Sequence, residues 1–202
     1  MTEAILSGLL AGYGVAIPVG AIGVLIVTLT ARTSFRVGAA AAAGVATADG
    51  LYAIAAVLGG ASLTPLIEPV ATPLTWLAAL VLLAVAARTA VAAFRERSER
   101  EVPLLTRPGR AYLALLGLTV LNPATIIYFA ALVLGRQAEN ALTTAEQFAF
   151  AVSAVAASLS WQLLLAAGGS LVGKALTGGR ARLLTSLAAS AIIAALAVLL
   201  VV

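Results

Sequence analysis

The sequence predicts an all-α membrane protein with six transmembrane helices, built as two inverted three-helix repeats whose first helices, 1 and 4, are interrupted at proline. Three observations predict it: an apolar composition, six long uncharged stretches and a one-sided distribution of basic residues. Of the 202 residues, 62% are hydrophobic and 10% are charged, and the mean hydropathy is +1.11. A soluble domain has about a quarter of its residues charged. Too few polar side chains remain here to cover a globule in water, so lipid is the expected solvent.

Each of the six stretches is long enough to cross a bilayer, which takes roughly 20 mostly apolar residues. Charged residues or prolines bound the stretches, and Asp49 is the one charged residue deep inside any of them. The predicted spans are 5–31, 37–60, 74–94, 111–135, 147–173 and 183–202. We expect one transporter domain over residues 1–202, with halves 1–94 and 111–202 joined by a loop at 95–110.

The basic residues orient these spans. Eleven of the 12 Lys and Arg residues fall in loops one, three and five or beside them, and Arg136 alone falls on the other side. Because Lys and Arg favour the cytoplasmic side, loop 95–110 should be cytoplasmic and both termini should lie outside. This topology explains the net charge of +4 better than a nucleic-acid partner does, and the arginines should contact anionic membrane lipids.

The residue types that are missing exclude several chemistries. The chain has no cysteine and no histidine, which removes disulfide frameworks, zinc hydrolases of the H-E-x-x-H type and Ser-His proteases. An intramembrane aspartyl protease needs two carboxylates, and only Asp49 lies at that depth. We therefore expect no enzyme, no cofactor and no metal site.

Two spans carry a proline near the middle, at corresponding positions of the two halves. Span 5–31 contains Pro18 and Gly20, and span 111–135 contains Asn122 and Pro123. Proline removes a backbone N–H and clashes with the carbonyl four residues earlier, and in lipid the freed groups must face protein, water or solute. Matching interrupted helices predict an inverted repeat with a binding site at its centre. The alternative is that both prolines only kink their helices.

Asp49 is the strongest candidate for a functional residue. An ionised side chain at that depth costs at least about 2.5 kcal/mol, and such residues usually face a cavity on a solute, ion or proton path. No Lys, Arg or His is available at that depth to pair with it. We expect it to bind a positive group of the substrate and to exchange that group for a proton. The alternative is a protonated Asp49 hydrogen-bonded to a neighbouring helix, for example at Ser158, Ser160 or Gln162.

Four further side chains complete the predicted substrate site. Thr47 and Tyr52 flank Asp49, and Tyr52 shares its helix face because the two are three residues apart. Trp161 and Gln162 lie at mid-depth in span 147–173. A tryptophan is normally interfacial, so Trp161 is either a cavity wall or a packing block.

Three short segments resemble the LysE-type amino-acid exporter family (LysE/RhtB-like translocators), and their order and spacing cover essentially the whole chain. They are Pro18-Val19-Gly20, Gly44-x-x-x-Ala48-Asp49-x-x-Tyr52, and Leu121-Asn122-Pro123-x-Thr125-Ile126-x-x-Phe129.

The resemblance implies export of amino acids or related small solutes across the bacterial cytoplasmic (inner) membrane, driven by the membrane potential or a proton gradient. It assigns functional weight to Pro18, Gly20, Asp49, Asn122 and Pro123. The family often has a second proline after Pro-x-Gly, and here that position is Ala21, so span 5–31 is expected to be less unwound. The substrate is not thereby fixed, since the wider superfamily includes cation, cadmium and lipid-related members.

The sequence therefore predicts a secondary transporter that exports a small molecule, with an amino acid favoured as substrate. Its amine would bind near Asp49 and its carboxylate near the positive half-helix ends. One alternative is a cation or heavy-metal exporter, which the missing thiolate and imidazole ligands count against. Another is a non-transporting membrane protein in lipid or glycolipid trafficking. Small-residue faces also allow a homodimer.

Overall fold

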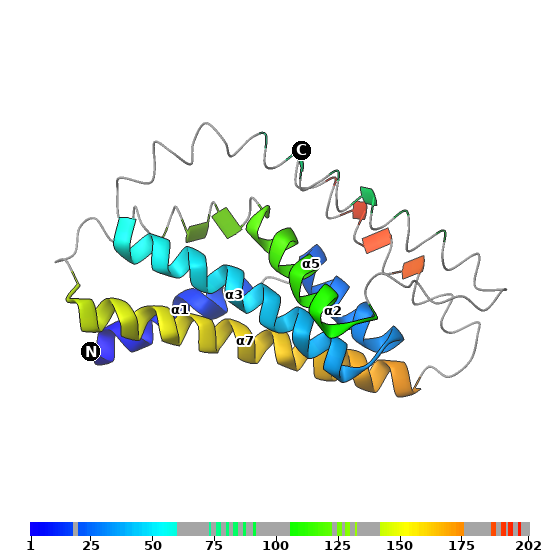
Figure 1. Cartoon of the computed structure of the whole chain (residues 1–202), viewed down its shortest axis with the longest axis horizontal. Helices are drawn as coiled ribbons and strands as arrows, with labels where there is room; N and C mark the ends of the chain where they lie inside the picture. Colours follow the sequence, from blue (N-terminus) through cyan, green and yellow to red (C-terminus); the bar gives the residue numbers. More distant parts are fainter. Residues whose placement is uncertain are drawn as a thin grey trace.

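The computed structural model describes residues 1–17, 20–59, 106–122 and 142–175, together with scattered helical positions between 73 and 91, between 125 and 132, and between 187 and 198. Regular structure in these residues is entirely helical (Figure 1). The helices with defined bounds are α1 (Thr2–Ala16), α2 (Ala21–Arg32), α3 (Phe35–Gly59), α5 (Pro108–Val120) and α7 (Thr144–Ala175).

The described helices give two or three candidate membrane spans. Phe35–Leu58 of α3 and Thr144–Gly173 of α7 are each long and apolar enough to cross a bilayer. Helices α1 and α2 pass the same test together, as one span bent by 75°. The chain is thus an all-helical membrane protein. The predicted spans 74–94 and 183–202, and the second half of span 111–135, lie largely outside the described residues.

Local sequence explains where these helices begin and end. Helix α1 ends just before Ile17-Pro18, as expected where a proline nitrogen cannot donate to the preceding turn. Helix α5 begins with Pro108 in its first turn, where the missing N–H has no cost. Before α7, the Thr143 hydroxyl accepts from the Glu146 N–H at 3.4 Å, and the Glu146 carboxylate accepts from the Thr143 N–H at 3.1 Å. This reciprocal pair is a capping box.

Helix α7 supports both α1 and α2 through glycine contacts. A Cβ added at Gly12 of α1 would lie 2.2 Å from the Ala154 carbonyl oxygen, and one added at Gly169 of α7 would lie 2.4 Å from the Val27 carbonyl oxygen of α2. Gly8 makes a similar approach to Phe150, and Gly173 to Ala31. Residue numbers rise together along these contacts, so α1 and α2 both run in the general direction of α7.

Helix α3 crosses between α7 and α5. It runs antiparallel to α7, since Gly50 meets Val155 and the Gln147 side chain donates to the Val57 carbonyl. It runs parallel to α5, with Gly44 against the Tyr112 carbonyl. Figure 1 shows α3 lying along α7, with α5 on its other side and the N-terminus beside the start of α7.

Among the described residues the core consists of two apolar clusters, which lie one after the other along α3 and α7. The α1-side cluster contains Ala11, Ala53, Ala56, Phe129, Phe150 and Ala154. The α2-side cluster contains Ala21, Leu25, Ile26, Val37, Ala41, Val45, Ala111, Leu115 and Ala166.

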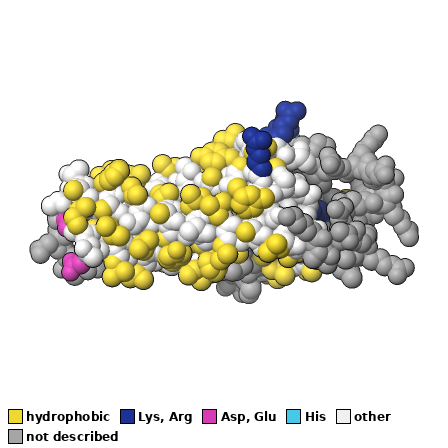
Figure 2. Space-filling model, turned by 90° about the horizontal axis from the view of Figure 1, so that it is seen from below, with side chains coloured by type: hydrophobic (Ala, Val, Ile, Leu, Met, Phe, Trp, Pro, Cys, Tyr) yellow, Lys and Arg dark blue, Asp and Glu magenta, His cyan; other side chains and the backbone are white. Residues whose placement is uncertain are grey.

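Charges of the described residues separate to the two ends of the bundle. Glu3 and Glu146 lie in the first turns of α1 and α7. The arginines lie at the opposite end, where α2 finishes and α3 and α5 begin: Arg32, Arg36, Arg107 and Arg110. Between the ends the surface carries many hydrophobic side chains (Figure 2), as a lipid-facing surface requires.

Candidate functional site

Three buried polar side chains form a layer between the two apolar clusters. On α3, Asp49 follows Val45 of the α2-side cluster by four residues and precedes Ala53 of the α1-side cluster by four. On α7, Ser158 and Gln162 fall in the same way between Ala154 and Ala166. The exposed fractions of Asp49, Ser158 and Gln162 are 2%, 0% and 4%. We call these three residues the polar layer.

Asp49 and Ser158 join α3 to α7 within this layer. The Ser158 hydroxyl donates to Asp49 Oδ2 at 2.6 Å. This is one of the inter-helix hydrogen bonds that the sequence offered as the alternative environment of Asp49. It does not saturate the group, because a carboxylate has about four lone-pair sites and a hydroxyl supplies one proton. The carboxylate therefore faces the protein interior, away from lipid, and retains capacity to accept from another donor.

Gln162 and Trp161 present polar atoms without partners. Gln162 Oε1 and Trp161 Nε1 are the buried side-chain atoms that lack a hydrogen bond within the described part of the chain. A buried polar group without a hydrogen bond lowers the stability of the folded protein by about 1 to 3 kcal/mol. These two atoms therefore need an explanation. One is an acceptor and the other a donor, and their residues are adjacent at the middle of α7.

The interruption of the first span lies level with the polar layer. Gly12 of α1 packs on Ala154 and Ala157, and Val27 of α2 packs on Gly169. The same register along α7 places Ala16, the last residue of α1, near Ser158 and Ala21, the first residue of α2, near Leu163. Gly20 is the N-cap of α2 and contributes no side chain to the cap. The first-turn N–H groups of α2 therefore point toward the level of Gln162.

The interruption of span 111–135 also lies near the polar layer, because Tyr52 connects the end of α5 to α3. Helix α5 ends at Val120, and the Tyr52 hydroxyl donates to the Val120 carbonyl at 2.5 Å. Asn122 Nδ2 donates to Thr125 Oγ1 at 3.1 Å across the end of the helix. Tyr52 also stacks on Phe129, with ring centroids 5.8 Å apart. Because Tyr52 is one turn from Asp49 on α3, both interruptions lie within about one helical turn of the polar layer.

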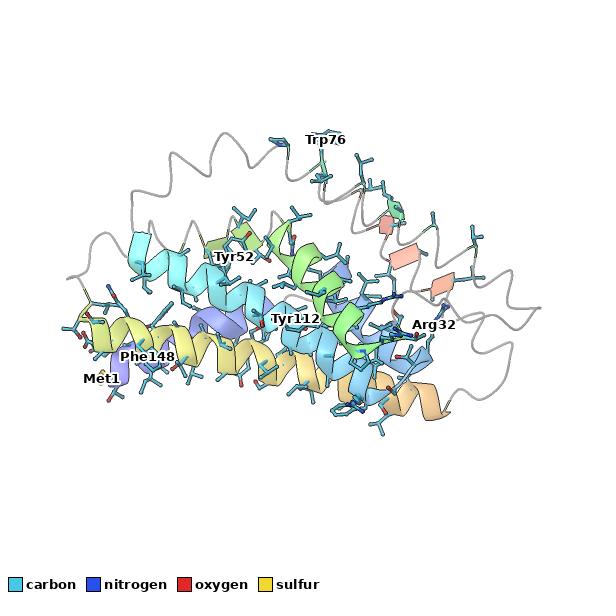
Figure 3. All side chains as sticks on the ribbon, viewed as in Figure 1. Met1, Arg32, Tyr52, Trp76, Tyr112 and Phe148 are labelled. Carbon is cyan, nitrogen blue, oxygen red and sulfur yellow. The ribbon has the colours of Figure 1, made fainter. Side chains whose placement is uncertain are left out.

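Thr47 connects α3 to α5 on the other side of Asp49. Its hydroxyl donates to the Ala43 carbonyl at 2.8 Å and accepts from the Tyr112 hydroxyl at 3.2 Å. Tyr52 and Tyr112 both lie where α3 faces α5 (Figure 3). Thr47 and Tyr52 thus hold the interrupted helix against the helix that carries Asp49.

The structure brings some of the predicted site residues together and leaves others outside. Asp49 and Gln162 lie in the polar layer, and Gly20 and Trp161 lie beside it. Tyr52 and Asn122 lie at the end of α5, and Thr47 contacts Tyr112 nearer its start. Pro18 and Pro123 lie outside the described residues.

Two tyrosines with inter-helix contacts were missed by the sequence reasoning. The Tyr13 hydroxyl lies 3.0 Å from Ser160 Oγ and links α1 to α7, and Tyr112 contacts Thr47. No local pattern marks either residue, because each contact depends on how two helices are rotated against each other. Ser158 was named only as one of three alternative partners of Asp49.

No group of three or more His, Cys, Asp or Glu side chains that could hold a metal ion occurs among the described residues. The polar groups of the polar layer are one carboxylate, one hydroxyl and one carboxamide. Such a set is suited to hydrogen bonding with a small polar molecule.

Comparison with known protein families identifies a family that covers most of the chain. The model of the family described as "LysE type translocator" matches residues 14–202. Neither the comparison with curated proteins nor the comparison with solved structures found a match.

Proposed function

Because the chain belongs to the LysE type translocator family, and so is a membrane transporter and not an enzyme, we propose that it is a secondary transporter that exports amino acids or related small polar solutes. The observation that carries this proposal is the polar layer, placed between two apolar clusters and level with both helix interruptions. Interrupted helices near mid-membrane are where transporters of this general design bind substrate.

The groups around the layer suit a zwitterion. The substrate's ammonium binds Asp49, which retains lone pairs beyond the one that Ser158 occupies. Its carboxylate binds the first-turn N–H groups of α2, which have no intrahelical partners and carry a partial positive charge. We assign Pro18 with Gly20, and Asn122 with Pro123, to the two interruptions from the sequence, because a proline cannot continue the hydrogen-bond ladder of a helix.

The packing supports two inverted repeats. Helix α1, the first part of span one, packs on α7, and α5, the first part of span four, packs on α3. An inverted repeat requires that the first span of each half pack on the second span of the other half. This holds here, because span five is the second span of its half, as span two is of the first half. Asp49 and Ser158, which contact each other, are each the fifteenth residue of their helices, which supports a pairing of α3 with α7 by such a repeat. The parallel directions of α3 and α5 are those required of spans two and four.

Transport then follows an alternating-access cycle. The two halves rock about the polar layer, and the site faces the cytoplasm and the outside in turn. On the outer side a proton replaces the substrate's ammonium at Asp49, which couples export to the proton gradient. The separation of Glu3 and Glu146 from the four arginines supports an orientation with the Arg-rich loops in the cytoplasm of a bacterial cell.

The test is counterflow of labelled amino acids in proteoliposomes that contain the purified protein. Asp49→Asn keeps the size of the side chain and removes its charge, so we expect loss of exchange and of stimulation by a pH gradient. Thr28→Ala is the matched control, because the Thr28 hydroxyl bonds only within its own helix, to the Val24 and Leu25 carbonyls, in the described contacts. Exchange by Asp49→Asn at the wild-type rate and with the wild-type pH dependence would remove Asp49 from the mechanism.

A further inference from the structure

We propose that Gln162 and Trp161 recognise the substrate's side chain, and that this side chain carries an uncharged hydrogen-bonding group such as a hydroxyl or a carboxamide. The inference rests on the proposed function and names the substrate class that the site selects. It starts from two buried polar atoms, Gln162 Oε1 and Trp161 Nε1, which have no partner within the described residues.

Gln162 lies between the two groups assigned to the substrate's backbone. Ser158, Gln162 and Ala166 are four residues apart, so they stack on one face of α7. Ser158 binds Asp49, and Ala166 belongs to the cluster that contains Ala21, the first residue of α2. Gln162 is therefore one turn along α7 from the residue that binds Asp49, and one turn from the residue that joins the cluster containing the start of α2.

Trp161 borders the same space from the side of the first span. Ala157, four residues before it, packs against Gly12 of α1, so Trp161 extends the same face toward the interval between α1 and α2. Its Nε1–H is buried at that level. Helix α7 thus offers an acceptor from Gln162 and a donor from Trp161 at the level of the polar layer.

This pair of atoms selects against two classes of amino acid. An aliphatic side chain would leave both atoms unsatisfied, which is the condition that protein interiors avoid. A second cationic group would need a second buried counter-charge, and Asp49 is the one buried carboxylate among the described residues. A hydroxyl or carboxamide can accept from Trp161, donate to Gln162, and remain neutral.

The experiment compares isosteric substrates in counterflow. Labelled threonine and valine differ by a hydroxyl in place of a methyl group, asparagine and leucine differ by a carboxamide in place of an isopropyl group, and lysine adds a charge. We expect threonine to exceed valine and asparagine to exceed leucine by roughly three- to tenfold in apparent affinity, the range for one or two neutral hydrogen bonds. Lysine should be the poorest of the five.

Variants of Gln162 and Trp161 test whether these residues cause the preference for polar over aliphatic side chains. Gln162→Met keeps the volume and removes the amide, so the threonine-to-valine and asparagine-to-leucine ratios should fall toward one. Gln162→Glu adds a carboxylate and should raise the affinity for lysine relative to asparagine. Trp161→Phe removes the N–H donor and should reduce both ratios. Ser153→Ala is the control on the same helix, since its hydroxyl bonds the Ala149 carbonyl, and should leave all ratios unchanged.

The outcomes separate this inference from the proposed function. Exchange of none of the five amino acids would overturn the amino-acid substrate in the proposed function and this inference with it. Exchange that favours leucine, valine or lysine would overturn the inference alone. Wild-type ratios in Gln162→Met would also overturn it, and the retained exchange in that variant would itself show that the protein is folded.

Discussion

At the scale of single residues, Tyr52 illustrates how a side chain can serve an interrupted helix. In an unbroken helix the Val120 carbonyl would accept from the N–H four residues later, but α5 ends at Val120. Inside a membrane such a carbonyl cannot be left bare. The Tyr52 hydroxyl supplies the missing donor from α3, so Tyr52 positions the end of α5.

Removing that hydroxyl should destabilise the protein. Tyr52→Phe keeps the stack on Phe129 but leaves the Val120 carbonyl without this donor, at a cost of about 1 to 3 kcal/mol. The measurement is thermal unfolding of the purified protein in detergent, where we expect a lower Tm than for the wild type. Tyr13→Phe, which removes a hydroxyl of an exposed side chain, serves as the comparison and should have the smaller effect. Equal Tm values for Tyr52→Phe and wild type would show that the carbonyl has another partner.

Ala21 stands where the family often has a second proline, and yet α1 and α2 remain separate helices. The sequence led us to expect a less unwound first span, because the second proline is absent. Ala21 is the first residue of α2, and α1 has already ended at Ala16. A first-turn N–H has no intrahelical partner, so alanine and proline are both accepted there. The structure therefore has two helices bent by 75° relative to each other, and Ala21 does not join them into one continuous helix.

At the scale of elements, the ends of the long helices could be predicted from the sequence to within a few residues. Spans 37–60 and 147–173 compare with α3 at Phe35–Gly59 and α7 at Thr144–Ala175. Charged residues mark where a helix leaves lipid, and they are visible in the sequence. Which of Ser158, Ser160 and Gln162 would bind Asp49 was not predictable, because that choice depends on the rotation of α7 against α3.

Adjacent glycines in α7 give a test of the packing of α2. A Cβ at Gly169 would meet the Val27 carbonyl oxygen at 2.4 Å, whereas a Cβ at Gly168 would meet nothing within 4 Å. Overpacking of this kind costs about 1 to 3 kcal/mol, so Gly169→Ala should lower the Tm. Gly168→Ala should leave it unchanged or raise it, because alanine favours a helix by up to about 1 kcal/mol over glycine. The same change of Tm in both variants would contradict the described contact.

At the scale of the whole molecule, the opposite charges at the two ends predict which end faces the cytoplasm. The chain has no cysteine, so single cysteines can report accessibility without further changes. Ala145→Cys, at the acidic end, should react with a membrane-impermeant maleimide in intact cells. Gly109→Cys, beside Arg110 and in open space, should react only after the cells are broken. The reverse pattern would invert the proposed orientation and the direction of export.

The packing of α1 and α2 on one continuous helix has a consequence for the spacing of the two parts of the first span. In this conformation Gly12 of α1 packs on Ala157 of α7, and Val27 of α2 packs on Gly169. At a rise of 1.5 Å per residue, these two contacts lie about 18 Å apart along α7. Their spacing should then be the same in thin and in thick bilayers, because the length of a continuous helix sets it and the lipid does not.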